Sequence, residues 1–373
     1  MRPRLLISSL AGLALLTAAA VPCLWDRDTL EQEKARFPSA IELITGKFPR
    51  HSEAYYRWRI EDREAQVADD GATAALYDDL AVAYSKLGDD ARAIELMTKK
   101  EEAFPGLYET AANLGTFHVH AGDLETGVEE IVRAIRINPD AHFGREIYQE
   151  MLARYVLARR EAGATLPLRS EPTRPFDDGE QGYWSFLLAE REIAENIEGE
   201  ELGRAFAGVT GMMRFGNHDS PVLLEALADL LLADYHKDGK RLAVRALLIA
   251  SFEVEDEAAR AAYRAKATEA LYEQTPTPRQ SKNLPLEELE ATFAKELEDA
   301  ETFFAELEAR ERFWIENDED VDARFADVYY TRHAHVEDPG RERYETIRRY
   351  GPSIVGVGGL VGLIYLIYLA RRR

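Results

Sequence analysis

Two adjacent stretches of this chain match each other at a fixed offset of 34 residues, and this internal repeat strongly constrains the fold. The two copies span residues 74–107 and 108–141. Within each copy a glycine permits a sharp turn and a later proline ends a helix. Each copy is therefore predicted to be two helices joined by a short connection. The matched positions are the pairs Leu80 and Leu114, Gly88 and Gly122, Asp89 and Asp123, and Pro105 and Pro139.

This pattern resembles the tetratricopeptide repeat (TPR) family, in which small residues at two positions let the paired helices approach closely. Ala81 and Ala93 fit those positions in the first copy, whereas Gly127 replaces the second alanine in the other copy. The resemblance implies an all-α, right-handed helical solenoid. Because two repeats cannot bury their own faces, we expect the solenoid to extend over residues 21–163. The segment around Trp25 is also similar to the leading segment of bacterial envelope TPR proteins.

Three further segments follow the repeats. Residues 164–180 are rich in proline, glycine and charge, which is typical of a linker. Residues 181–275 carry helical patterns and one degenerate repeat, so we predict a second helical block. Within residues 284–330, apolar side chains recur at three- and four-residue steps from Leu286, which predicts one long amphipathic helix that ends at about Glu316. This helix either forms a coiled coil or lies along the helical block, and the width of its apolar stripe favours the second arrangement.

Both ends of the chain carry membrane signals. Residues 1–20 have a basic start, an apolar run and then small residues, which is the plan of a secretory signal peptide. Residues 353–370 contain no charge, and a helix of that length spans about 27 Å, enough for a bilayer core. We therefore predict a single-pass membrane protein with an extracytoplasmic body, a juxtamembrane segment at residues 331–352 and a cytosolic tail at residues 371–373.

Charge and cysteine content exclude several kinds of partner and site. The chain has 46 Lys and Arg against 68 Asp and Glu, a net charge of -22, which phosphate backbones would repel. We therefore expect no nucleic-acid partner. The single cysteine, Cys23, excludes an intramolecular disulfide and a four-cysteine zinc site. Gly358 and Gly362 have the GxxxG spacing of close helix contacts, so they offer a homodimer contact within the predicted span.

In TPR proteins the first helix of each unit lines a concave groove that binds partner segments. The resemblance implies that Asp78 stands where a carboxylate-binding clamp would have a lysine, so such a clamp is not expected here. The acids instead favour a basic or neutral peptide segment of a protein partner. The alternative is an ordinary solvated helix face. The residues of this chain that the resemblance places on the groove are Asp78, Asp79, Val82, Glu109, Asn113, Thr116 and His120.

No pattern of residues indicates catalysis, a cofactor or a metal. Asp318, Asp320 and Asp322 imitate the first three ligands of a calcium loop, but Ala323 replaces the glycine that the loop requires. Carboxylates are so numerous that paired acids occur by chance, so no catalytic pair stands out. We therefore expect no catalytic residue, no cofactor and no metal ligand.

Together these features predict a membrane-anchored extracytoplasmic TPR scaffold or adaptor that mediates protein–protein interaction and is not an enzyme. The alternative is an extracytoplasmic enzyme or solute-binding component that uses carboxylate or metal chemistry in the second helical block. A third interpretation is a structural role through self-association of the long helix.

Overall fold

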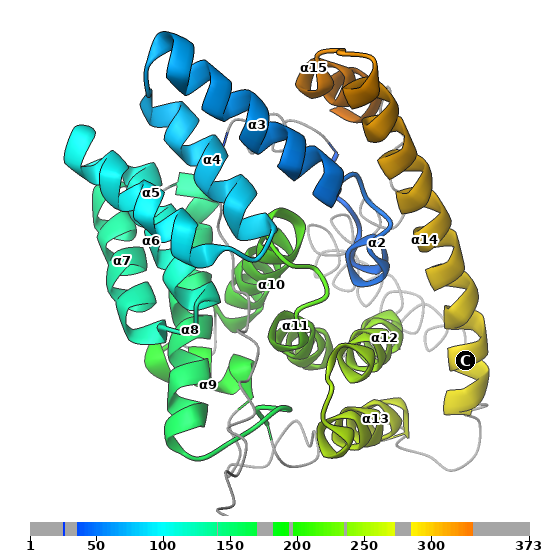
Figure 1. The fold of residues 1–373 in the computed structure, drawn as a ribbon. Helices are drawn as coiled ribbons and strands as arrows, with labels where there is room; N and C mark the ends of the chain where they lie inside the picture. The colour runs from blue at the N-terminus through cyan, green and yellow to red at the C-terminus, as the bar shows by residue number, and fades with distance from the viewer. Residues whose placement is uncertain are drawn as a thin grey trace, which may run out of the picture. The chain divides into compact units, whose positions relative to one another are not determined.

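The regular secondary structure of the described residues consists of helices (Figure 1). The computed structural model describes residues 25–26, 36–139, 141–169, 182–193, 197–234, 237–272 and 285–330. The prediction of an all-α fold is confirmed for these residues. The α-helices are α2 (Ala40–Thr45), α3 (Glu53–Asp70), α4 (Ala74–Lys86), α5 (Asp90–Ala103), α6 (Tyr108–His120), α7 (Leu124–Ile137), α8 (Arg145–Glu161), α9 (Tyr183–Glu190), α10 (Glu198–Phe215), α11 (Pro221–Ala233), α12 (Lys237–Glu253), α13 (Glu257–Tyr272), α14 (Leu286–Glu316) and α15 (Val321–Phe325).

The two copies of the repeat form matching helix pairs, α4–α5 and α6–α7. Gly88 and Gly122 lie in the connections with φ angles of 84° and 88°, a left-handed conformation that glycine adopts without strain. The aspartate that follows caps the second helix of each pair. A backbone amide three residues later donates to Asp89 at 3.0 Å and to Asp123 at 3.2 Å. The same turn and the same cap are thus used twice, which makes the architecture helical and repeat-like.

The second helix pair is packed so closely that its two interior glycines have no room for a side chain. A Cβ atom on Gly115 would lie 2.6 Å from Cγ1 of Ile131 and 2.9 Å from the backbone nitrogen of Ile131. A Cβ atom on Gly127 would lie 2.5 Å from Cγ2 of Val119. In the first copy the equivalent of Gly115 is Ala81, which is fully buried. The pairs therefore share a topology but differ in how closely their helices approach.

Replacing Gly115 by alanine is expected to lower the free energy of unfolding by about 1–3 kcal/mol, because the added carbon overlaps the backbone of α7. This loss outweighs the helix propensity of alanine, which exceeds that of glycine by about 1 kcal/mol. Gly199→Ala in α10 is a matched control, since nothing lies within 4 Å of that position. Chemical denaturation of both variants tests this. Equal stability of the two would mean that α6 and α7 move apart at little cost.

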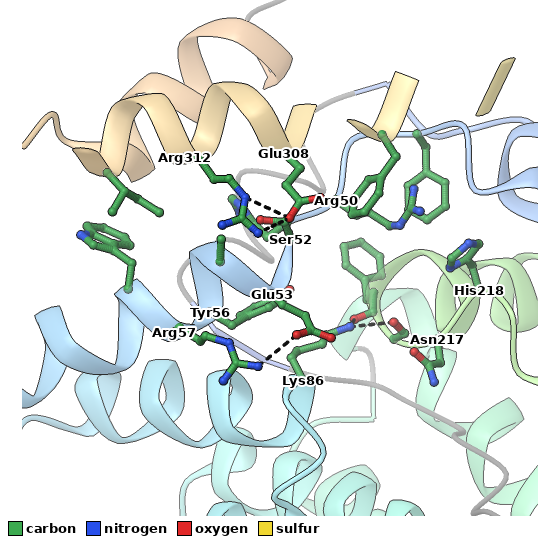
Figure 2. A pocket seen from close by; sticks show the side chains of 18 of the residues that line it. Arg50, Ser52, Glu53, Tyr56, Arg57, Lys86, Asn217, His218, Glu308 and Arg312 are labelled. Carbon is green, nitrogen blue, oxygen red and sulfur yellow. Dashed lines mark hydrogen bonds and ion pairs between the residues drawn. The ribbon is translucent and has the colours of Figure 1, made fainter. Parts of the chain in front are cut away.

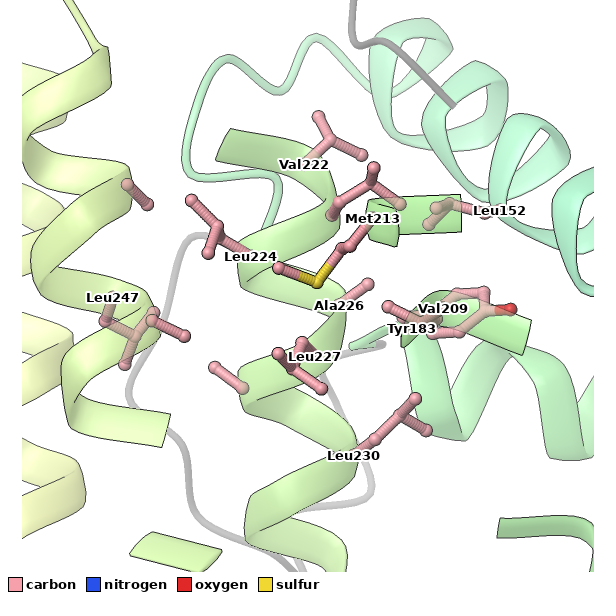
Figure 3. Close-up of a cluster of buried hydrophobic side chains, with 14 of the residues drawn as sticks. Leu152, Tyr183, Val209, Met213, Val222, Leu224, Ala226, Leu227, Leu230 and Leu247 are labelled. Carbon is pink, nitrogen blue, oxygen red and sulfur yellow. The ribbon is translucent and has the colours of Figure 1, made fainter. Parts of the chain in front are cut away.

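One hydrophobic core joins the repeats to the second helical block. Its buried side chains come from α2, α6, α7 and α8 and also from α9 to α13 and the start of α14. Figure 3 shows Leu152 of α8, Met213 of α10 and Leu224 of α11 converging in this core. The start of the predicted linker takes part as well, because Leu168 is buried and its amide donates to Glu225 of α11 at 2.9 Å. The predicted repeat domain and the predicted second block therefore share one hydrophobic core. The rest of the predicted linker, residues 170–180, lies outside the described residues.

Helix α14 lies within the stretch in which the sequence predicts one long helix. Its apolar stripe is buried at Leu289, Phe293 and Leu307, among other positions, against α13, α2 and α3 of the same chain. Figure 1 shows α14 (yellow) running along these helices to α15, which lies near α3. The stripe therefore packs along the helical body, as the sequence favoured, and is not left open for a coiled coil.

Several predictions fall outside the described residues. They are the signal peptide at residues 1–20, the juxtamembrane segment at 331–352, the membrane span at 353–370 with Gly358 and Gly362, and the tail at 371–373. Among the described helices, none combines the length and the apolar character that crossing a bilayer requires.

Candidate functional site

Asp78, the first of the predicted groove residues, is buried and lies in an internal polar cluster. The ammonium of Lys100 donates to its two carboxylate oxygens at 2.6 and 2.7 Å. The amide nitrogen of Asn113 also donates to Asp78, at 3.0 Å. Asn113 in turn bonds both backbone groups of Trp25, at 2.8 and 2.9 Å. The segment at residues 25–26 therefore covers the helix face that the sequence had placed on an open groove.

Asp79 of α4 is buried in a second polar cluster, which also includes side chains of α3, α15 and the segment at 25–26. It pairs with the guanidinium groups of Arg59 at 3.0 Å and Arg63 at 2.9 Å. Arg59 also pairs with Asp26 at 2.9 Å, and Arg63 also pairs with Asp322. Because Arg59 and Arg63 are four residues apart, the sequence indicates that they share one helix face. It does not indicate which acids pair with them.

The remaining groove residues divide into interior and partly exposed side chains. Val82 is buried, and Thr116 is buried where it accepts a hydrogen bond from Gln149 of α8 at 3.0 Å. Glu109 and His120 are only partly buried, and binding of a partner by these two stays a prediction. The expectation of surface contacts is corrected for the interior residues, because the segment at 25–26 and helices α3 and α8 cover them. Those residues are Asp78, Asp79, Val82, Asn113 and Thr116.

A cavity lies elsewhere among the described residues, between α3, the α10–α11 connection and α14. Its volume is about 740 Å³. Residues from distant parts of the chain line it, including Tyr56 of α3, Lys86 at the end of α4, His218 of the connection and Phe304 of α14. Figure 2 shows these walls, which bring aromatic and charged side chains together. Sequence reasoning missed this site, because no motif marks residues that meet only in the folded chain.

The exposed rim of the cavity carries two ion pairs within single helices. Arg57 pairs with Glu53 at 3.1 Å on α3, and Arg312 pairs with Glu308 at 2.7 Å on α14 (Figure 2). Both pairs have the spacing of neighbours on one helix face and lie in contact with water. The charge of these rim residues is therefore balanced locally.

The inner end of the cavity carries two cations. The ammonium of Lys86 donates to the backbone oxygens of Phe215 at 3.1 Å and Gly216 at 2.6 Å, where α10 ends. A cation is favourable there, because the last carbonyl groups of a helix carry partial negative charge. Burial nevertheless lowers the pKa of Lys86 to about 8. The Lys86 charge is thus held in a poorly solvated place.

Arg50 is the second inner cation. Its guanidinium lies 3.8 Å from the centre of the Phe304 ring and 5.6 Å from that of Phe48, and it donates to the backbone oxygen of Gly46. Stacking on aromatic faces suits a planar guanidinium. Burial lowers the pKa of Arg50 to about 10, so it remains charged at neutral pH.

His218 lies beside both cations. Its ring meets that of Phe48 edge to face, with ring centres 5.5 Å apart, and its Nε2 packs against Gly46. Burial lowers the pKa of His218 to about 4, and the charges of Arg50 and Lys86 act in the same direction while Asp219 opposes them. His218 is therefore neutral at physiological pH.

Stability is expected to fall by up to about 3 kcal/mol through His218 as the pH falls from about 6.5 to about 4. In that window the unfolded chain takes up a proton on His218 and the folded chain does not, so protons favour unfolding. His218→Gln should remove this part of the pH dependence, measured as unfolding midpoints across the window. Asn217→Gln, an exposed neighbour, is the control. A His218→Gln profile parallel to the wild type would contradict this assignment.

The acids considered for metal or acid–base chemistry have structural roles in the described part of the chain. Asp320 caps α15, and Asp322 pairs with Arg63 and accepts a hydrogen bond from Tyr55 at 2.7 Å. No group of His, Cys, Asp and Glu side chains able to hold a metal occurs among the described residues. In the second block, Glu225 accepts three bonds at 2.9 Å, from the amides of Leu168 and Arg169 and from a tyrosine hydroxyl.

The cavity next to Glu225 measures about 20 Å³, room for no more than a water molecule. The described residues of the second block therefore offer no space for a substrate beside this carboxylate. The cavity at Lys86 and Arg50 is the better candidate for a binding site.

Comparison of the chain with protein-family models and with curated proteins finds no match in either case.

Proposed function

We propose that this protein is a membrane-anchored, extracytoplasmic adaptor of TPR-like construction, and that the cavity between α3, the α10–α11 connection and α14 receives a segment of a partner protein. The observation that carries the proposal is the cavity itself. Its volume of about 740 Å³ is in the range of ligand pockets, and its walls come from segments that only a rigid helical scaffold holds together.

The lining of the cavity favours a polypeptide. Aromatic rings of Phe48, Tyr56 and Phe304 supply apolar contact area, and the charged rim supplies polar contacts to backbone and side chains. Large aromatic and arginine side chains around a desolvated centre are typical of the anchoring parts of protein interfaces. The alternative, a solute-binding or enzymatic role in the second helical block, is less well supported, because the cavity described there is water-sized.

Anchoring in the membrane is proposed from the sequence of residues 1–20 and 353–370. The body then lies outside the cytosol, at a distance from the bilayer set by residues 331–352. A reporter enzyme fused after Arg373 is expected to be active in the cytosol. Activity on the outer side only would contradict this topology.

Photocrosslinking in living cells tests the adaptor function. A photoreactive phenylalanine placed at Arg57 or at Arg312, on opposite walls of the rim, is expected to give the same protein adduct. Both positions are exposed, so the substitutions should cost less than about 1 kcal/mol of stability. Lys99 on α5, exposed and outside the cavity, is the control position. Failure to obtain an adduct from either wall, or the same adduct from Lys99, would contradict the proposal.

A further inference from the structure

The two cations at the inner end of the cavity differ from three other buried cations of this protein. Arg59, Arg63 and Lys100 each have a carboxylate oxygen within 3.0 Å. In contrast, neither Arg50 nor Lys86 forms an ion pair with a carboxylate of the described residues, although acids outnumber bases 68 to 46 in the chain. Their hydrogen bonds go to backbone carbonyl groups, which leave a net positive charge in place.

The acids around the cavity do not neutralise this charge. Glu53 and Glu308 pair with rim arginines, and Glu61 and Glu316 are exposed at the rim. Asp26 attracts Lys86 but is paired with Arg59. Among the inner lining residues, Asp219 is the acid that attracts both cations, without forming an ion pair with either. Lys86 and Arg50 therefore lack a directly paired carboxylate among the described residues, and Arg214 adds a further buried cation to the lining.

Both cations retain hydrogen-bonding capacity toward the cavity. An ammonium has three N–H donors, of which Lys86 uses two for the end of α10. A guanidinium has five, and Arg50 uses one or more for the backbone oxygen of Gly46. Charge-assisted hydrogen bonds to an oxyanion are about twice as strong as neutral ones. The inner end thus combines an uncompensated charge with donors that can recognise oxygen atoms.

We propose that Arg50 and Lys86 bind the carboxylate of a glutamate or aspartate side chain in the partner segment. This inference rests on the proposed adaptor function and names the chemistry of its partner. A carboxylate presents two oxygen acceptors to the remaining N–H donors of Arg50 and Lys86, and a side-chain carboxylate belongs to the partner segment itself. The rings of Phe48, Phe215 and Phe304 suit apolar residues on either side of the acid.

The proposal reverses the charge that the sequence predicted for the partner. That prediction depended on Asp78 and Asp79 being exposed, and the structure pairs both with buried cations. The net charge of the whole chain therefore says little about this site, because charges beyond about 10 Å are largely screened in salt.

The first test measures how much adduct forms from the Arg57 position in charge variants of the full-length protein. Lys86→Met is expected to reduce the adduct at least about tenfold, since removing one partner of a buried charge pair costs several kcal/mol of binding. Lys86→Arg keeps the charge and should retain capture. Lys47→Met is the matched control, because Lys47 is exposed and does not line the cavity. Unfolding midpoints of each variant show whether the chain still folds.

The second test uses the captured segment as a synthetic peptide with blocked ends. The peptide is expected to compete for adduct formation. Replacing its acid by the matching amide should abolish competition with the wild-type protein. With Lys86→Met, the acid and amide forms of the peptide should compete equally. Acetate and inorganic phosphate are parallel probes. Competition by either ion at millimolar concentration would assign the site to a free anion and overturn the proposal.

The outcomes separate this inference from the adaptor function. An adduct that is unchanged in a folded Lys86→Met variant would keep the cavity as the partner site and overturn the carboxylate assignment. Absence of any adduct from the cavity would overturn both.

Discussion

Replacing Arg63 by methionine is expected to lower the free energy of unfolding by about 3–5 kcal/mol. The guanidinium of Arg63 holds two buried carboxylates, Asp79 of α4 and Asp322 of α15. Methionine fills much of the same volume, but it removes positive charge that balances the two carboxylates in a poorly solvated place. Because Asp322 lies in α15, we also expect α15 to open more easily.

Arg57→Met is the matched control for Arg63→Met. Both arginines lie on α3 and each has an acidic partner, but the pair of Arg57 with Glu53 is exposed. Exposed pairs contribute up to about 1 kcal/mol, so this variant should be close to wild type. Denaturant midpoints measure the difference, and hydrogen exchange reports opening at α15. Equal midpoints for the two variants would mean that water reaches Asp79 and Asp322 without loss of structure.

Replacing Lys100 by methionine is expected to lower the free energy of unfolding by about 3–5 kcal/mol at a pH above about 7, where Asp78 is ionised in the wild type. Lys100 is almost fully buried and donates to both oxygens of Asp78. Burial raises the pKa of Asp78 to about 7 and Lys100 acts in the opposite direction, so removing Lys100 raises it further. The deficit relative to wild type should therefore grow as the pH rises above about 7, where Asp78 loses its proton in the folded wild type but not in the folded variant.

Two controls make the Lys100 prediction specific. Lys99→Met removes the adjacent lysine, which pairs with Glu95 on the surface, and should have little effect. The double variant Asp78→Asn, Lys100→Met removes both charges and should recover most of the loss, because a neutral pair no longer carries an uncompensated charge. A double variant as unstable as Lys100→Met alone would show that the loss comes from packing and not from charge.

Much of the local structure could be predicted from the sequence. The connections at Gly88 and Gly122 and the caps at Asp89 and Asp123 depend only on residues within one turn. The bounds of α14 follow similarly from an apolar stripe that begins after Pro285. These signals act over a few residues, so no knowledge of the rest of the fold is needed to interpret them.

The candidate site could not be predicted in the same way. Asp78 and Asp79 looked exposed because a repeat pattern says which helix face lies on the concave side, but not what else covers it. The cover is the segment at Trp25 and Asp26 together with α3, held by Asn113, Arg59 and Arg63. Nothing in the periodicity of the repeats indicates that an upstream segment occupies that face.

The amino-acid sequence alone therefore determined the helical class, the repeated helix pairs and the long helix α14, since propensity, caps and periodicity are properties of neighbouring residues. The tertiary fold decided which charges are buried in pairs and which face a cavity. Arg50, Lys86, His218 and Phe304 come from four separate segments, and their meeting depends on how the faces of α3, α4, α10 and α14 pack. Hydrophobic periodicity specifies that a face is buried but not its partner, so the cavity and its uncompensated cations emerge only when the helices are assembled.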